Sequence, residues 1–429
     1  MLRKIYANGK DEIELLNGMS KRSVSANKEI TEIVSAIIDD VKENGDEAIK
    51  QYTLKFDKQL PEYFEVPREV INDALTEADP EFVDAILNAQ ENIAEFHNRQ
   101  KEQSFIDAKP NGVILGQKLR GLDRVGLYVP GGTAPLFSSV LMNSIPAKIA
   151  GVKEIIMVTP PQKDGTPNKE MLIAAAICGV DRVFLAGGAQ AVAALAFGTE
   201  TVPKCDKIVG PGNIFVTTAK KLLYGTVDID MIAGPSEILV LADKTANAKY
   251  VAADLLSQAE HDILASSILV TTDEKLADEV ISQVEIQLEK LPRKDIARKS
   301  VDDFGAVIVC DSLEKAIEVS NFIAPEHLEV QTENPLELLG ALDNAGSIFL
   351  GQYAPEALGD YFAGPNHVLP TSGTARFYSP LSVYDFVKRS SYIYYTRDAL
   401  CEAKDNIILM AEKEGLGAHA NSVRIRFED

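Results

Sequence analysis

Residues 124–151 read RVGLYVPGGTAPLFSSVLMNSIPAKIAG, a short apolar run that is closed by proline and glycine and followed by a longer apolar segment. The same order of short run, turn and longer segment recurs three more times before residue 226. Strand, turn and helix in this repeated order predict a parallel β-sheet with helices on its faces. A second series of the same kind occupies residues 236–351, after a boundary near AGPSE at residues 233–237. The sequence therefore predicts an α/β protein with two similar, doubly wound modules.

The segments that flank the two series have a different character. Residues 25–56 and 81–100 carry apolar side chains at three- and four-residue spacings, which is typical of amphipathic helices. His97 stands in the second of these charged segments, so we expect its ring at the surface. Beyond Ser379 a short aromatic stretch precedes one predicted helix, residues 401–415, and a tail.

The length of 429 residues corresponds to two or three domains. The chain carries 43 Lys and Arg against 64 Asp and Glu, a net charge of −21. Its longest basic cluster is the short RKDIARK at residues 293–299, so a nucleic-acid partner is not expected. No apolar run approaches the roughly 18 residues that span a bilayer, and the N-terminus lacks a signal-peptide pattern. We therefore expect a cytoplasmic protein that binds no membrane and whose charge mildly favours a cationic small substrate.

The four cysteines are far apart and include no C-x-x-C pair. We expect buried free thiols in a reducing compartment rather than disulfides or metal ligands. They are Cys178, Cys205, Cys310 and Cys401.

Three glycine turns follow predicted strands, but none has the G-x-G-x-x-G pattern of a dinucleotide site. The turns are Pro130–Gly132, Gly187–Gly188 and Gly210–Gly212. Glycine at a strand end lets the backbone approach a phosphate at the start of a helix. Such turns also occur in α/β proteins that bind nothing there, so they leave a nucleotide site open.

The five histidines include one that is spaced for metal binding. Gln258 and His261 are three residues apart on a predicted helix and share one face, with Asp254 on the same side as a supporting group. Two side chains in this arrangement can hold one metal ion. An ordinary solvated helix face explains the same spacing.

Two further groups combine carboxylates with imidazoles. If Pro325 opens a helix, Glu326 and His327 lie in its first turn, where the helix dipole keeps His327 neutral and ready to act as a base. Equally, Glu326 is an ordinary residue for a helix start and His327 an incidental neighbour. Asp360 and His367 flank the glycine-rich loop GDYFAGPNHVLPTSG, which suits a site but also suits side chains that only bond the backbone.

Together these fragments resemble the histidinol dehydrogenase family. The resemblance runs from about residue 110 to the C-terminus and, more loosely, through the N-terminal segment. Five long motifs carry it in order, namely IDMIAGPSEILVLAD, DLLSQAEH, APEHLEVQT, GQYAPEALGDYFAGPNHVLPT and GLGAHANSVRIR, and LYVPGGTAPLFSSVLM, GGAQAVAALAFGTE and KIVGPGN fit too.

The resemblance implies an enzyme that oxidises L-histidinol to L-histidine through bound histidinaldehyde, with NAD⁺ as acceptor and one Zn²⁺ per subunit. It implies that Glu326 and His327 are the acid/base pair. The implied zinc ligands are Gln258, His261, Asp360 and His419. The implied contacts to substrate are these four ligands with Ser236, His327, His367 and Glu414. The implied NAD site is lined by Tyr128, Gln190 and Asn213.

The resemblance also implies two incomplete Rossmann-like domains, a helical N-terminal arm and a C-terminal helix and tail. The arm covers residues 1–25. Residues 26–125 and 236–378 would form the larger domain with the zinc and catalytic residues, and residues 126–235 the NAD-binding domain. Residues 379–429 would be exchanged in a homodimer whose active sites are shared between subunits.

Two other classes of protein fit parts of the pattern. A zinc-dependent hydrolase also uses a metal, a carboxylate and a histidine, but it needs no glycine turns at strand ends. A two-domain solute-binding protein also pairs α/β modules, but it would carry an export signal and no metal cluster. Neither class accounts for five motifs in order.

Overall fold

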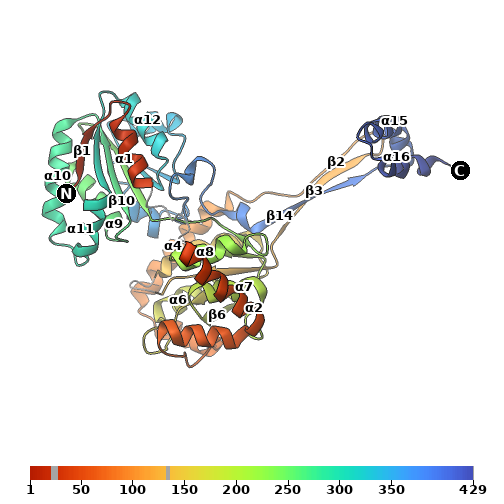
Figure 1. Ribbon diagram of the computed structural model, residues 1–429, viewed down its shortest axis with the longest axis horizontal. Coiled ribbons are helices and arrows are strands. Elements are labelled where there is room, and N and C mark those ends of the chain that lie inside the picture. The colour runs from red at the N-terminus through yellow and green to blue at the C-terminus, as the bar shows by residue number, and fades with distance from the viewer. Residues whose placement is uncertain (21–27, 132–135, 429) are drawn as a thin grey trace. The chain divides into compact units, whose positions relative to one another are not determined.

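The computed structural model describes residues 1–20, 28–131 and 136–428, and the chain divides into two units (Figure 1). The first unit comprises residues 1–100 and 122–386, and the second comprises residues 101–121 and 387–429. Residues 21–27, 132–135 and 429 lie outside the described residues, so the expected arm and the first glycine turn are described only in part.

The first α/β series forms a five-stranded parallel sheet in the order β6-β5-β4-β7-β8. The chain starts at the central strand, fills one side and returns to fill the other, as expected for a doubly wound sheet. Its strands are β4 (Arg124–Tyr128), β5 (Glu154–Thr159), β6 (Arg182–Leu185), β7 (Lys207–Val209) and β8 (Asp228–Ile229). The helices that connect them are α5 (Phe137–Ala150), α6 (Lys169–Ile177), α7 (Gly188–Phe197) and α8 (Ile214–Leu223).

Three N-terminal helices cover this same sheet, contrary to the expectation that residues 26–125 join the second series. Helix α2 (Lys28–Asp57) packs with α7 and α8 on one face (Figure 1). Helices α3 (Arg68–Thr76) and α4 (Pro80–Asn98) pack with α6 and α5, in the core of the other face. Amphipathic periodicity shows that a helix buries one face, but it does not show which sheet the helix covers. The expected assignment of residues 26–125 to the domain of residues 236–378 was therefore wrong.

His97 corrects a second expectation. It is fully buried, and its Nδ1 lies 2.8 Å from the amide oxygen of Gln100. His97 stands four residues after Ile93 in α4, on the face that packs into the core. The charges on the other face of the helix gave no indication of this position.

The second series forms a six-stranded parallel sheet in the order β1-β11-β10-β9-β12-β13. Its strands are β1 (Arg3–Tyr6), β9 (Glu237–Ala242), β10 (Ser266–Thr271), β11 (Gly305–Val309), β12 (His327–Gln331) and β13 (Ser347–Leu350). The accompanying helices are α1 (Asp11–Ser20), α9 (Ala248–Ala259), α10 (Glu274–Leu288), α11 (Lys294–Phe304), α12 (Leu313–Ile323), α13 (Pro335–Leu338) and α14 (Glu356–Tyr361). The expected N-terminal arm is helical in α1, but its first residues form an edge strand because β1 pairs with β11.

The second unit contains an antiparallel sheet in the order β14-β3-β2, which the sequence did not predict. Its strands are β2 (Phe105–Ala108), β3 (Ile114–Gly121) and β14 (Val387–Tyr394), and its helices are α15 (Arg397–Lys413) and α16 (Gly417–Arg424). Pairing between β3 and β14 joins segments more than 260 residues apart in the chain, so no local pattern reports it. It also assigns residues 101–121 to the C-terminal segment rather than to the larger domain.

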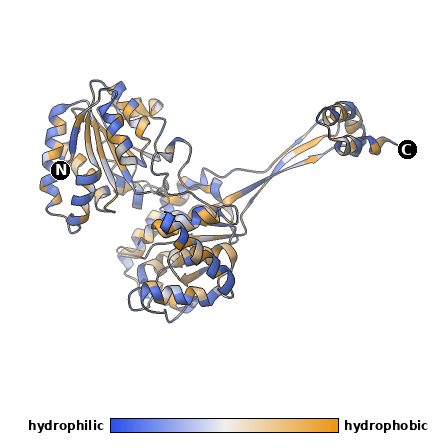
Figure 2. Cartoon of the chain, viewed as in Figure 1, coloured by the Kyte–Doolittle hydropathy of each residue, from blue (hydrophilic) through white to orange (hydrophobic). Residues whose placement is uncertain are grey.

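Hydrophobic residues are concentrated in the strands of both parallel sheets, whereas the helices combine hydrophobic and hydrophilic residues (Figure 2). No helix among the described residues is long and apolar enough to cross a membrane. All four cysteines are free, as expected, but Cys401 is exposed rather than buried.

The packing of α2 can be tested by substitution. Ile49 is fully buried in the core between α2 and the five-stranded sheet, whereas Leu54 on the same helix is 52% exposed. Ile49→Ala is expected to lower the free energy of unfolding by about 2–5 kcal/mol, and Leu54→Ala by less than about 0.5 kcal/mol. Urea denaturation of the two variants provides the measurement. Equal, small losses would contradict this packing.

Candidate active site

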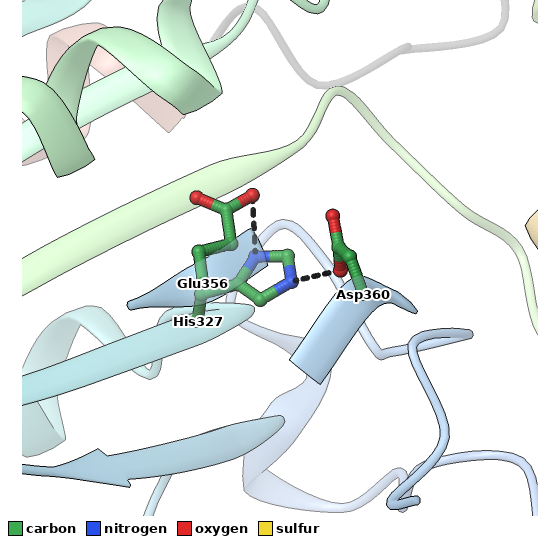
Figure 3. A group of neighbouring side chains, drawn as sticks. All are labelled: His327, Glu356 and Asp360. Carbon is green, nitrogen blue, oxygen red and sulfur yellow. Dashed lines mark ion pairs between the residues drawn. The ribbon is translucent and has the colours of Figure 1, made fainter. Parts of the chain in front are cut away.

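His327 is the first residue of β12, where its register partner is Ile238 of β9. Its Nδ1 lies 3.1 Å from the carbonyl oxygen of Glu237, which identifies Nδ1–H as the donor. Its Nε2 is buried without a hydrogen-bond partner within the described chain and lies 3.7 Å from Asp360 Oδ1 (Figure 3). The ring is therefore held by one nitrogen and presents the other.

Glu326 directly precedes β12, and its Oε2 accepts a hydrogen bond of 2.9 Å from the backbone N–H of Glu237. Burial raises the pKa of Glu326 to about 7, against the opposing effect of His327. Neither residue lies in a helix, because α12 ends before Ala324 and the chain passes into a strand. The expected helix start at Pro325 is therefore wrong.

Three carboxylates set the charge of His327. Burial by itself lowers the pKa of His327, but Glu356, Glu326 and Asp360 outweigh it and raise that pKa to about 10. The Glu356 side chain is 2% exposed and places Oε1 3.8 Å from His327 Nδ1 (Figure 3). The carboxylates thus favour the imidazolium, whereas the expected helix dipole would have opposed it.

Gln258 and His261 lie together, as their spacing predicted. Gln258 is in the last turn of α9 and His261 follows the helix, with 3.2 Å between the Gln258 amide and His261 Nδ1. With its amide nitrogen donating to Glu356, Gln258 turns its oxygen toward His261. The carboxylate of Asp360, on α14, is close enough to interact electrostatically with His261.

The donor atoms in this region suit a metal ion. One ligand atom each from His327, Glu356 and Asp360 lies within 4.8 Å of the others. The buried Nε2 of His327 without a partner adds a nitrogen donor to carboxylate oxygens. Nitrogen and oxygen donors in this combination fit zinc.

A cavity of about 230 Å³ opens beside His327 and Asp360. Its wall also includes His367, whose Nδ1 lies 3.0 Å from the backbone oxygen of Asp360. The size suits a small metabolite rather than a polymer.

A second group of polar side chains supports α14, and the sequence reasoning had identified only Asp254 among its members. The Nε2 of Gln331 donates to Asp254 at 2.8 Å and to Glu329 at 2.9 Å. Glu329 in turn accepts the backbone N–H of Glu356 at 2.8 Å. Asp254 therefore supports α14 through Gln331 and Glu329, and among the described contacts it makes no hydrogen bond to Gln258. The available signal in the sequence was that Glu329 and Gln331 alternate with Leu328 and Val330 in a buried strand.

Burial and the neighbouring Asp254 raise the pKa of Glu329 to about 9. Asp254 and Glu329 also hydrogen-bond through their carboxyl groups, and burial raises the pKa of both, which favours one proton held between them. One proton between Asp254 and Glu329 would leave the pair with one negative charge instead of two. Glu329 is the member of the pair that contacts the start of α14.

The remaining expected substrate contacts lie in different places. Ser236 is half-buried and directly precedes Glu237, at the same edge of the sheet. Glu414 follows α15 and His419 is in α16, both exposed in the second unit. Their roles stay predictions.

The expected NAD residues gather at the carboxyl edge of the five-stranded sheet. Tyr128 ends β4, and its hydroxyl accepts the N–H of Gly188 at 3.1 Å. Gln190 is buried in α7 and, among the residues described, its Oε1 has no hydrogen-bond partner. Asn213 caps α8 by accepting the N–H groups of Phe215 and Val216, which is a structural role in its own right. A free polar atom beside glycine turns fits a nucleotide.

Known proteins resemble the chain over its whole length. The family model for histidinol dehydrogenase matches residues 20–427. A histidinol dehydrogenase from Clostridium acetobutylicum is 56% identical over 428 residues, which cover 100% of this chain and 99% of that protein. One from Listeria innocua is 55% identical over 96% of both chains. The crystal structure of histidinol dehydrogenase from Elizabethkingia anophelis superposes with a TM-score of 0.93 at 42% identity, covering 99% of this chain and 98% of that one.

The support beneath α14 leads to a prediction. Glu329→Ala removes the acceptor for the Glu356 N–H and leaves Asp254 without its partner, so the free energy of unfolding should fall by about 1–3 kcal/mol. Glu329→Gln keeps an acceptor and supplies an amide donor, so it should retain most of the stability. Urea denaturation compares the two variants. If the glutamine variant is as unstable as the alanine variant, these hydrogen bonds do not account for the contribution of Glu329 to stability.

Proposed function

Because the chain belongs to the histidinol dehydrogenase family, we propose that it oxidises L-histidinol to L-histidine in two NAD⁺-dependent steps at one zinc-containing site. The activity completes L-histidine biosynthesis. The observation that carries the proposal is the grouping of His327 with Glu326 and Asp360. Gln258 and His261 join this group, because Gln258 contacts Glu356 and His261 interacts electrostatically with Asp360.

The zinc would be held by Gln258, His261 and Asp360, with His419 as the fourth ligand. When bound, zinc would supply a positive template for the imidazole and amine of histidinol and would offset the carboxylate charge around His327. Ser236, His367 and Glu414 would contact the substrate with these residues. The imidazole of His261, the amide oxygen that Gln258 turns toward it and the carboxylate of Asp360 support this assignment, because they combine nitrogen and oxygen donors.

In the first oxidation His327 removes the hydroxyl proton of histidinol through Nε2. The Glu237 carbonyl oxygen holds the other ring nitrogen, so that Nε2 can accept a proton when the ring is neutral. The carbinol carbon gives its hydride to NAD⁺, and the products are histidinaldehyde, NADH and one proton.

In the second oxidation Glu326 takes a proton from water as the water oxygen adds to the aldehyde carbon. The protonated His327 returns its proton to the former aldehyde oxygen, which gives the hydrate and leaves His327 neutral. His327 then accepts a hydroxyl proton of the hydrate as the same carbon gives its hydride to a second NAD⁺. The buried position of both residues keeps bulk water from the aldehyde. Retention of the aldehyde makes the second step nearly unimolecular.

The NAD⁺ site would use Tyr128, Gln190 and Asn213, and the active sites would be shared in a homodimer. The second unit leaves large apolar side chains exposed, including Leu409, Met410 and Ile425 at 55–67%. Exposed apolar side chains of this kind support an interface with a second copy of the chain. Each copy would then bring its His419 and Glu414 to the active site of the other. Free cysteines support a cytoplasmic location.

The stoichiometry tests the proposed reaction. If one site performs both oxidations, each histidinol consumed should yield two NADH, with little free aldehyde. Absorbance of NADH, set against chromatographic loss of histidinol, gives the ratio. A ratio near one would identify a simple alcohol dehydrogenase.

Substitutions should separate the two acid/base residues. His327→Asn should slow oxidation of both histidinol and added histidinaldehyde by roughly 10²–10⁴-fold, since each step transfers a proton to His327. Glu326→Gln should impair aldehyde oxidation selectively, because activation of water belongs to that step. Single-turnover NADH formation from each substrate measures the effects. Small, equal effects of both substitutions on both substrates would refute the assigned roles.

A further inference from the structure

A buried ion pair joins α8 to the end of β8 in the first unit. The ammonium of Lys220 contacts Asp230 Oδ1, and the two side chains are only 3% and 1% exposed. Removal of both charges from water is costly, so such a pair is a weak source of stability. The hydrogen bonds that the two side chains make to the backbone indicate a different role for the pair.

Both members of the pair bond the same glycine. Lys220 Nζ donates to the backbone oxygen of Gly210 at 2.9 Å, and the Gly210 N–H donates to Asp230 Oδ2 at 2.8 Å. Gly210 has φ +112°, and a Cβ there would lie 2.1 Å from the backbone oxygen of Tyr128. The pair therefore fixes both polar groups of a residue that only glycine can occupy.

This glycine begins the turn that leads to Asn213, the cap of α8. On its other side lies Tyr128, whose hydroxyl holds Gly188 at the start of α7. The position of Gly210 thus sets the spacing between the glycine turns that follow β6 and β7, with the end of β4 between them. Nucleotides bind at this kind of edge in doubly wound sheets.

We propose that Lys220 and Asp230 are positioning residues for the dinucleotide, acting through Gly210 without touching the ligand. This inference rests on the proposed NAD⁺-dependent function. The same module offers a comparison, since Lys207 on β7 pairs with Asp228 on β8 at 2.8 Å. That pair is open to solvent at Asp228, which is 52% exposed, and neither of its side chains bonds a glycine turn among the described contacts.

The test replaces both charges so that neither is left buried alone. Lys220→Met/Asp230→Asn should raise the Kd for NADH and the KM for NAD⁺ by roughly 10-fold or more, because small misplacements of positioning groups have large effects. The KM for histidinol and the zinc content should not change. Lys207→Met/Asp228→Asn is the matched control and should match the parent in all four quantities. NADH fluorescence titration gives the Kd without reference to turnover.

A folded Lys220→Met/Asp230→Asn variant with parental NADH affinity would overturn the proposal. If that variant does not fold, Lys220→Arg decides, because it keeps the charge pair but shifts the donor to Gly210. The proposal expects Lys220→Arg to weaken NADH binding selectively, and parental affinity in this variant would overturn it. Failure of the proposed function itself would be seen separately, as a parent protein that neither binds NADH nor forms it from histidinol.

Discussion

The parallel register of β9 and β12 is the constraint on which the catalytic group depends. It sets His327 against Ile238, so that the backbone of Glu237 contacts both candidate acid/base residues. The Glu237 carbonyl accepts from His327 Nδ1–H, and the Glu237 N–H donates to Glu326. A slip of one residue would turn each side chain of β12 to the opposite face of the sheet. Backbone pairing, rather than a flexible loop, therefore aims these two groups.

The two parallel sheets place their functional residues at opposite edges. His327 and Glu237 begin their strands in the six-stranded sheet, whereas Tyr128 ends its strand in the five-stranded sheet and Gly210 follows another. Nucleotide sites in doubly wound folds usually lie where strands end, as Tyr128 does. A site where strands begin, as at His327, is unusual. The proposed dinucleotide site therefore lies at the carboxyl edge of its sheet, whereas the acid/base residues lie at the amino edge of theirs.

Burial of carboxyl groups is compensated locally in the six-stranded module. Burial raises the pKa of Glu326 to about 7, of Glu356 to about 8 and of Glu329 to about 9. Backbone N–H groups donate hydrogen bonds to Glu326 and Glu329, and the carboxyl group of Asp254 hydrogen-bonds that of Glu329. Each hydrogen bond offsets part of the desolvation cost of an acid that lies close to His327. The bond from the Glu356 N–H to Glu329 also holds the start of α14, the helix that carries Asp360.

The sequence by itself determined the two α/β series, the family motifs and the closeness of Gln258 to His261, because strand–turn–helix order and helical spacing are local properties. Only the tertiary structure decided that α2 covers the five-stranded sheet, that β3 pairs with β14, and that His327 lies in a strand. Glu356 and Glu329 likewise became visible as site residues only in the fold. Pairing and burial join segments that are distant in the chain, and no local pattern specifies which distant segment an apolar face or a strand edge will meet.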